Sequence, residues 1–544
     1  MTRTSARELL LVVLGFVALT LVVFRPMPWH LGSIVYNPEN GDGQFTVWNV
    51  GWVAHALWRN PLHVLDANIF YPHRWTLAYS ELNLFAGAIA SPVYWLTGGN
   101  AYAAANFALL AAFVLSGTGM YLLCREVSGD RRAAVVGGVA YAFCPHVFGH
   151  LPHIQLLMTG GLPFSLLAFH RMLERPTPTR GALLGLAMAL QAYACAYYSV
   201  FVLLMVGYAV LLLAALRRSF TSWPYWKAVL SGAVVSIVLS APLVATMLFL
   251  QESGFERTLD GSRRYVADWR TYLASGNLLH AWMLAHIGSW KELLFPGFIA
   301  VVFGLIAIPL GWRSGGRRRE AVLLYGGLTV AAGWASFGPD AGLYTLLYRV
   351  IPTFSRLRAP SRFGLIVVFG LAVLASLAVA WLLERLPRAA APTVAAILIA
   401  GAVAEAQIPL TFDPVLEPHP AYRMLATLPD GPVLELPIYS RALGFRRSRY
   451  MLDSTWHWKP LVDAYSDYIP PDFDARAEAL ADFPSLGSLT DMKRDGVRYA
   501  VIHLVPYEGD MRTALDARIK EFAPYLRELH RDNELLLFEV VRYP

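Results

Sequence analysis

Long apolar segments recur along this 544-residue chain, and they constrain its fold more than any other feature of the sequence. The longer ones run for roughly 18 to 24 residues, which is enough for a helix to cross a hydrocarbon core about 30 Å thick. Of all residues, 56% are hydrophobic and only 15% are charged, whereas about a quarter of an ordinary soluble domain is charged. The sequence therefore predicts a polytopic α-helical membrane protein.

About eleven transmembrane helices are expected from these segments. Their ranges are 8–24, 101–124, 133–146, 155–172, 181–196, 198–216, 228–250, 295–312, 320–337, 363–384 and 390–409. If the N-terminus is cytoplasmic, the arginine clusters between the segments fall on cytoplasmic connections, as the positive-inside rule requires. This holds only if the apolar segment Leu84–Leu96 lies in the outer interface, because one more crossing would reverse every later connection.

The positive net charge of the chain is explained by this topology. Its formal net charge is +7, and the arginines stand in short clusters between apolar segments. These clusters act as topology signals, so membrane lipid is an expected partner and nucleic acid is not. The predicted location is the bacterial inner (cytoplasmic) membrane, with a cytoplasmic N-terminus and an extracytoplasmic C-terminus.

Two domains are expected. Residues 1–410 would form the membrane domain, and residues 411–544 a soluble extracytoplasmic α/β domain. The tail contains short apolar strands, such as 433–436 and 499–504, between polar stretches that permit helices. The membrane domain would present outer loops at 25–100, 251–294 and 338–362.

The first outer loop holds an acid directly after the first span, in Asn40-Gly41-Asp42-Gly43-Gln44. A turn is the simplest interpretation of Asp42, since Asp between glycines favours turns. A functional acid is the alternative. Further along this loop, His73 and Glu81 stand among aromatic residues of the kind that form interfacial belts. These two residues are candidates for contacts to a sugar.

The short connection 144–155 contains three histidines, His146, His150 and His153. Metal ligation, contacts to a phosphate or sugar, and structural hydrogen bonding are all open interpretations, because imidazole together with carboxylate suits divalent ions. Ionisable groups at a membrane boundary are costly and tend to mark function.

Three arginines, Arg356, Arg358 and Arg362, stand at the outer end of a predicted span, against the positive-inside rule. Guanidinium groups form forked pairs with phosphate, so binding of a lipid-linked phosphate would explain them. Headgroup snorkelling is the alternative. In the loop 251–294, weaker candidates of the same kind are Glu252, Glu256, Arg263 and Arg264.

Two tail segments, 454–460 and 463–468, mix aromatic and polar residues as sugar-binding surfaces do. A packing face against the membrane domain explains the same composition. We favour the packing interpretation.

These features together resemble the GT-C superfamily of integral membrane glycosyltransferases, in particular bacterial YfhO-like and protein-O-mannosyltransferase-like membrane proteins. The resemblance also rests on the architecture of several spans followed by an outer C-terminal domain. The motifs that carry it are Gly41-Asp42-Gly43, Tyr71-Pro72-His73, Glu81-Leu82-Asn83, Gly149-His150-Leu151-Pro152-His153-Ile154-Gln155 and Arg358-Ala359-Pro360-Ser361-Arg362-Phe363.

The resemblance implies transfer of a sugar from a polyprenyl-phosphate-linked donor to a glycan, lipid or protein acceptor, in the building of cell-envelope glycans. It implies a catalytic role for Asp42, although many relatives carry paired acids where this chain has one. A divalent cation, Mg or Mn, could be held by Asp42, His150 and His153. The alternative is a transporter or flippase for a lipid-linked glycan, or an assembly factor.

A single displacement with inversion is the expected mechanism. Asp42 would accept the acceptor's hydroxyl proton, which requires only a carboxylate within hydrogen-bond reach. The leaving phosphate would be stabilised by cationic donors in a water-poor cleft. The residues expected to bind substrate are His73, Glu81, His150, His153, Arg358 and Arg362. This mechanism expects Asp42, the histidines and the arginines to converge in one cavity at the extracytoplasmic lipid boundary.

Overall fold

A computed structural model describes the chain apart from residues 1–3, 253, 255–256, 289–290, 352–353 and 355–356. The chain forms two compact units. Unit 1 comprises Met1–Trp29 and Ala108–Thr411, and unit 2 comprises His30–Phe107 and Phe412–Pro544. Most of the first outer loop therefore belongs to the same unit as the C-terminal tail, a grouping that the expected division at residue 411 does not contain.

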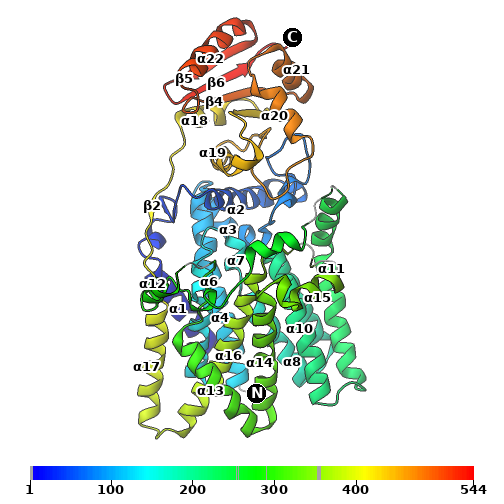
Figure 1. Cartoon of the computed structure of the whole chain (residues 1–544), viewed down its shortest axis with the longest axis vertical. Coiled ribbons are helices and arrows are strands. Elements are labelled where there is room, and N and C mark those ends of the chain that lie inside the picture. Colours follow the sequence, from blue (N-terminus) through cyan, green and yellow to red (C-terminus); the bar gives the residue numbers. More distant parts are fainter. Residues whose placement is uncertain (1–3, 253, 255–256, 289–290, 352–353, 355–356) are drawn as a thin grey trace. The chain divides into compact units, whose positions relative to one another are not determined.

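Helices occupy every range in which a transmembrane segment is expected, and the long helices of unit 1 run alongside one another (Figure 1). The helices within the expected ranges are α1 (Ala6–Val23), α4 (Ala101–Ser128, which begins in unit 2), α5 (Arg131–Ala142), α7 (Ile154–Leu157), α8 (Gly161–Glu174), α9 (Pro178–Ala194), α10 (Ala196–Leu216), α11 (Trp223–Glu252), α13 (Phe298–Ser314), α14 (Gly316–Ser336), α16 (Gly364–Arg385) and α17 (Ala390–Glu405).

In the described part of the chain, six helical segments are long and apolar enough to cross a membrane. The multi-pass character is thus confirmed. The remaining expected spans are shorter or more polar: α5 has 12 residues, about 18 Å of helix, and α14 begins with a run of arginines. The count of about eleven crossings therefore stays a prediction, as does the orientation of the termini.

Helix α16 forms the centre of unit 1. All its side chains from Gly364 to Ala380 are buried, as expected of a helix that is apolar on every side. The short 3-10 helix η9 (Pro360–Phe363) leads directly into it. The second half of the arginine motif is therefore fixed at the end of the most buried helix of this unit.

The histidine-rich connection between α5 and α8 folds into two short helices, α6 (Pro145–Phe148) and α7. Pro145 opens α6 at a position where its missing N–H costs nothing. His146 and His150 are 1% and 8% exposed, so this connection is an interior segment of unit 1.

Unit 2 contains a four-stranded mixed sheet formed by the tail (Figure 1). Strand β3 (Val433–Leu436) pairs in parallel with β4 (Tyr499–His503), and β6 (Leu535–Val540) pairs antiparallel with both β4 and β5 (Leu526–Arg531). Its helices are α18 (Pro420–Thr427), α19 (Ser448–Ser454), α20 (Phe473–Ala481), α21 (Leu486–Asp495) and α22 (Asp510–Glu521). The expected α/β character is present, and the extracytoplasmic location of the tail stays a prediction.

The first outer loop contributes two helices to unit 2, α2 (Gly41–Arg59) and α3 (Leu84–Leu96), which pack on each other. Helix α3 has the 13 residues expected of a segment too short to span. A two-residue strand, β1 (Ile34–Val35), pairs antiparallel with β2 (Asp413–Pro414). Residues far apart in sequence thereby form one folded body.

Asn68 joins the loop to the tail within this body. Its Oδ1 accepts a hydrogen bond from Trp48 Nε1 at 2.9 Å, and its Nδ2 donates to Ser454 Oγ at 3.1 Å and to the Lys459 carbonyl at 3.2 Å. The backbone continues this link, because the Leu461 N–H donates to the Asn68 carbonyl. Asn68 is 5% exposed, so water cannot replace it as a hydrogen-bond partner of these groups.

We expect Asn68→Ala to destabilise unit 2 by about 1–3 kcal/mol, the cost of leaving buried polar groups without partners. The readout is the thermal unfolding midpoint of the purified protein in detergent. Asn533→Ala, at an exposed position of the same unit, is the matched control and should leave the midpoint unchanged. Equal midpoints for the two variants would show that the Asn68 link contributes nothing.

Candidate functional site

Asp42 lies in the first turn of α2. Asn40 caps this helix, because its Oδ1 accepts a hydrogen bond from the Gly43 N–H at 2.9 Å. The turn interpretation of this segment is therefore wrong: a capping residue followed by permissive glycines starts a helix. The positive end of the helix dipole favours a carboxylate at this place.

Tail residues of unit 2 pack on the first turn of α2, which carries Asp42. Tyr465 Oη donates to Asp42 Oδ1 at 3.3 Å, and Ser448 Oγ donates to Gln44 Oε1 at 2.9 Å. A methyl group on Gly41 would lie 3.1 Å from the Phe445 carbonyl oxygen, so only glycine fits without a shift. Tyr465, from the segment 463–468, thus contacts α2 within unit 2 and orients the candidate acid. Packing of this segment against the membrane domain stays a prediction.

His73 and Glu81 are also held within unit 2. His73 Nε2 lies 3.0 Å from Asp472 Oδ1, and the Glu81 carbonyl accepts a hydrogen bond from Asn49 Nδ2 at 3.0 Å. Both residues are half-buried. The His73 contact ties the loop to the tail, and sugar binding by these two residues stays a prediction.

The histidines of unit 1 form a cluster with an acid from the loop 251–294. The rings of His146 and His150 have centroids 4.4 Å apart, and His150 Nε2 lies 3.5 Å from Glu292 Oε2. Ser361 Oγ, beside Arg362, donates to Glu292 Oε1 at 3.3 Å. Two helical connections and one long loop therefore meet here.

The hydrogen bonds of the cluster define its tautomers. His150 Nδ1 lies 2.7 Å from the His146 carbonyl, so Nδ1 carries the proton and Nε2 carries a lone pair. Tyr198 donates its hydroxyl proton to the Leu156 carbonyl and can accept from His146 Nε2 at 3.3 Å. His146 Nδ1 is then a lone pair, and it is buried with no hydrogen-bond partner among the described residues.

His146, His150 and Glu292 can each offer an electron-pair donor to a metal ion. These three side chains offer ligand atoms within 4.8 Å of one another. Burial lowers the pKa of His150 to about 3 and that of His146 well below its usual range, which keeps both imidazoles in the neutral form that ligates metals. The donor set fits a divalent cation.

Arg362 brings a fixed positive charge to the cluster, which also disfavours protonation of His150. Its guanidinium carbon lies 4.6 Å from the centroid of the Tyr197 ring, and Tyr197 Oη donates to the Ala359 carbonyl at 2.6 Å. Arg362 Nε is buried and has no hydrogen-bond partner among the described residues. An anion at this point would satisfy it.

Two other candidate residues, His153 and Arg358, each lie near an aromatic or imidazole ring. The His153 ring lies 6.1 Å from the His150 ring, and Arg358 lies 5.4 Å from the centroid of the Tyr265 ring. Arg356 and Glu256 lie outside the described residues. Within unit 1 the structure thus brings His150, His153 and Arg362 together. Asp42 belongs to unit 2, and its place in the same cavity stays a prediction.

Glu292 and Tyr465 were missed by sequence reasoning. Glu292 stands in Lys291-Glu292-Leu293, where nothing in the local pattern distinguishes it from a solvated acid. Tyr465 was grouped with a packing face of the tail. Only the fold shows that each contacts a candidate residue.

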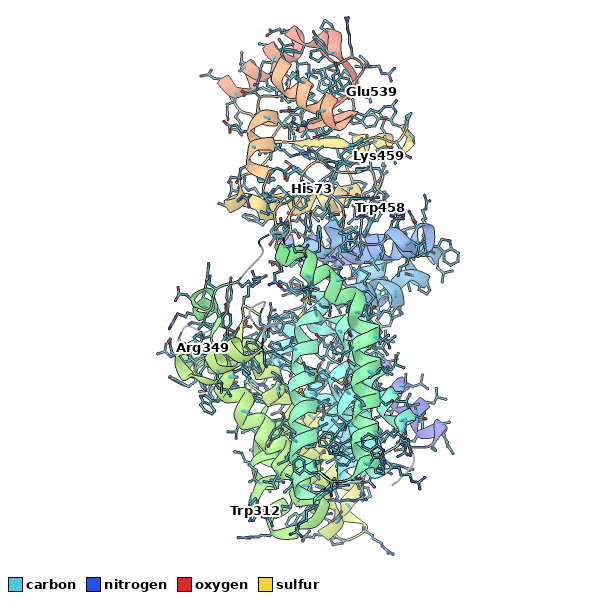
Figure 2. The ribbon with its side chains drawn as sticks, turned by 90° about the vertical axis from the view of Figure 1, so that its right-hand side faces the viewer. His73, Trp312, Arg349, Trp458, Lys459 and Glu539 are labelled. Carbon is cyan, nitrogen blue, oxygen red and sulfur yellow. The ribbon has the colours of Figure 1, made fainter. Side chains whose placement is uncertain are left out.

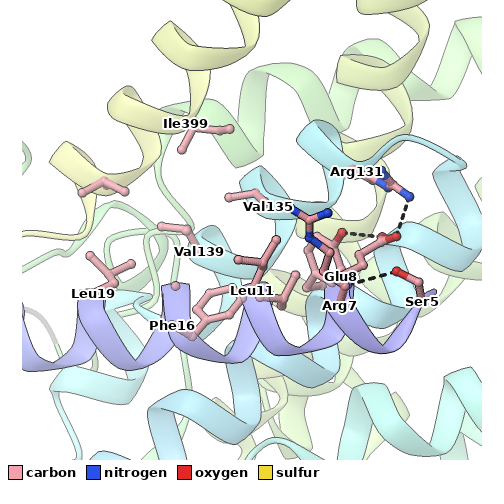
Figure 3. A pocket seen from close by; sticks show the side chains of 14 residues that line it. Ser5, Arg7, Glu8, Leu11, Phe16, Leu19, Arg131, Val135, Val139 and Ile399 are labelled. Atoms are coloured by element: carbon pink, nitrogen blue, oxygen red, sulfur yellow. Dashed lines mark hydrogen bonds and ion pairs between the residues drawn. The ribbon is translucent and has the colours of Figure 1, made fainter.

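A cavity of about 630 Å³ lies between α1, α5 and α17 and has a mainly apolar lining (Figure 3). Its one acid, Glu8, is paired with Arg125 and Arg131. This cavity adjoins α5 from Arg131 to Val139, whereas His146 follows the C-terminal end of α5. It holds none of the candidate residues.

No family model and no curated protein matches this sequence. Among solved structures, the chain is similar to the arabinofuranosyltransferase AftD from Mycobacteria, with 13% identity and a TM-score of 0.57 over 98% of this chain and 40% of that one. A mutant of AftD gives 16% identity and a TM-score of 0.59, covering 98% and 41%. ArnT from Cupriavidus metallidurans, bound to undecaprenyl phosphate, gives 14% identity and a TM-score of 0.45 over 98% of both chains.

The chain spans about two fifths of the length of AftD. At such low identity the similarity concerns the fold. The chain shares its fold with that arabinofuranosyltransferase.

Proposed function

We propose that this chain is a membrane glycosyltransferase that moves a sugar from a polyprenyl-phosphate-linked donor to a hydroxyl acceptor on the extracytoplasmic side. The fold that it shares with an arabinofuranosyltransferase supports the reaction class. One observation carries the donor class: Arg362 has a buried Nε without a partner among the described residues, beside two neutral imidazoles. A phosphate would pair with that guanidinium.

The reaction is a single displacement. The acceptor oxygen attacks the anomeric carbon, the bond from that carbon to the phosphate oxygen breaks, and the electron pair leaves with the lipid phosphate. Asp42 accepts the acceptor's proton, and Tyr465 holds the Asp42 carboxylate by its hydrogen bond. Attack opposite the leaving group inverts the anomeric configuration.

Charge on the leaving phosphate is offset by fixed donors. The Arg362 backbone is fixed in η9 and its guanidinium lies against the Tyr197 ring, so its orientation is set before the reaction, which is the condition for strong electrostatic stabilisation. His150, His153 and Arg358 would contact the phosphate or the first sugar. His73 and Glu81 would orient a sugar from unit 2.

A divalent cation fits the donors His146, His150 and Glu292. Bound there, it would add positive charge against the phosphate. Two imidazoles and one carboxylate suit manganese or zinc better than magnesium, which prefers oxygen ligands. The participation of Asp42 and His153 in such a set remains a proposal.

We expect the purified protein to hold about one equivalent of a transition metal, and His146→Ala to lower this content at least about tenfold, because a three-donor set loses one ligand. The measurement is metal content by mass spectrometry after dialysis against manganese or zinc. His286→Ala, at an exposed histidine of the same unit, should retain the metal. A wild-type protein free of metal after this treatment would exclude the site.

The proposed function itself is tested by incubating the protein in proteoliposomes with synthetic polyprenyl-phosphate sugars. Release of the lipid phosphate together with glycosylation of an acceptor is the expected result. A flippase would instead move the intact donor across the bilayer.

A further inference from the structure

An aromatic cavity of about 310 Å³ lies wholly within unit 2, in the size range of small-molecule sites, about 300–1,000 Å³. Its walls come from the end of α2, the end of α3 with the turn that follows, the start of α4, and the tail segment after α19. The residues that matter below are His55, Arg59, Tyr94, Trp95, Trp456 and Trp458.

Two indole rings enclose the imidazole of His55. The Trp458 ring stacks on it with centroids 5.0 Å apart and an angle of 30°, and the Trp95 ring stacks with centroids 6.2 Å apart and an angle of 20°. Trp458 lies beside α2 in Figure 2. Trp456 is 46% exposed although it lines the cavity, so it offers an indole to an incoming ligand.

A chain of hydrogen bonds fixes the proton of His55. Trp458 Nε1 donates to Tyr94 Oη at 3.0 Å, and Tyr94 Oη lies 3.3 Å from His55 Nδ1. Tyr94 is 2% exposed, so its own proton needs an acceptor, and among the described residues His55 Nδ1 lies within reach. Burial and the neighbouring Arg59 lower the pKa of His55 to about 4. The imidazole is therefore neutral, and its Nε2–H is a donor.

The chemistry of this lining selects one class of ligand. Indole faces are electron-rich and attract the C–H groups of a sugar ring, while His55 Nε2–H and the exposed Arg59 guanidinium donate hydrogen bonds to hydroxyl or carboxylate oxygens. The positive charge of Arg59 repels a quaternary ammonium ligand, a class of ligand that aromatic cages otherwise bind. An interfacial aromatic belt would explain the tryptophans alone, but it does not require the polar relay from Trp458 through Tyr94 to His55.

We propose that this cavity binds one sugar residue of a glycan acceptor, with the ring against Trp456 and hydroxyl groups on His55 and Arg59. The inference rests on the proposed glycosyltransferase function and narrows its acceptor from glycan, lipid or protein to a glycan. The cavity adds a subsite for the acceptor chain to the residues proposed for the reaction itself.

Binding is measured with the full-length protein in detergent, by tryptophan fluorescence and saturation-transfer NMR, against arabinan, mannan, galactan and glucan oligosaccharides of three to six residues. One class should bind saturably. Trp456→Ala should weaken it about tenfold, equivalent to about 1.4 kcal/mol, and Arg59→Gln should also weaken it. Trp269→Ala, at an exposed tryptophan of unit 1, should bind like the wild type.

The two proposals fail in different ways. If the wild-type protein transfers sugar but no oligosaccharide binds, or if Trp456→Ala binds and transfers normally, the subsite is overturned while the enzyme stands. A higher KM for the glycan acceptor with unchanged kcat in Trp456→Ala supports the subsite. Binding of phosphatidylglycerol vesicles that depends on Trp456, without oligosaccharide binding, would assign the cavity to lipid and overturn it.

Discussion

Replacement of Asp42 by asparagine should lower sugar transfer by about 10²–10⁴-fold, the range that a positioned general base contributes. The substitution keeps the size of the side chain and its place in the first turn of α2. It removes the charge that accepts the proton, so the loss should appear in kcat and leave donor binding nearly unchanged. The measurement is initial-rate kinetics with a polyprenyl-phosphate sugar donor.

Glu39→Gln is the matched control, because Glu39 is an exposed acid three residues earlier. We expect a change below about twofold there, as for other surface substitutions. Tyr465→Phe should give an intermediate loss, since it removes a hydrogen bond to the Asp42 carboxylate and keeps the ring. Full activity in Asp42→Asn would remove Asp42 from the mechanism.

Replacement of Arg362 by glutamine should lower transfer by about 10²–10³-fold, comparable to the loss of one preorganised donor at a developing anion. Arg362→Lys should recover only part of this, because an ammonium group keeps the charge but lacks the forked geometry. Both variants should bind a polyprenyl phosphate analogue more weakly than the wild type. The readouts are steady-state kinetics and competition with that analogue.

The control for this pair is Arg385→Gln, at the exposed far end of α16, the helix that follows η9. Its transfer rate should stay within about twofold of the wild type. If Arg362→Gln binds the lipid phosphate as tightly as the wild type does, phosphate recognition must lie elsewhere, and snorkelling would account for the arginines.

Helix positions could be predicted from the sequence because the bilayer imposes a length and an apolar composition on each segment. The helix at Leu84–Leu96 and the strands expected at 433–436 and 499–504 followed from local patterns in the same way, and the second strand ends one residue earlier, at His503. The start of α2 did not, since Asp between glycines also suits a turn. The Asn40 cap and the tail residues around Gly41 decide in favour of a helix.

Only some residues of the candidate site could be predicted from the sequence. His150, His153 and Arg362 could be singled out because charged or polar groups at a membrane boundary are costly. Glu292 could not, because its approach to His150 depends on how a long loop folds back. The grouping of residues 30–107 with the tail could not be predicted from the sequence either, since it depends on long-range hydrogen bonds such as that of Asn68 to Ser454.

The most direct test of the account is donor turnover by the purified protein. Isotope-labelled polyprenyl-phosphate sugars are supplied with glycan acceptors, and mass spectrometry and NMR follow the lipid phosphate and the anomeric configuration of the product. The account predicts that the wild type releases the lipid phosphate from one donor class and forms an inverted glycoside, and that Asp42→Asn and Arg362→Gln do neither at a comparable rate. Intact donor under all conditions, or a product of retained configuration, would contradict it.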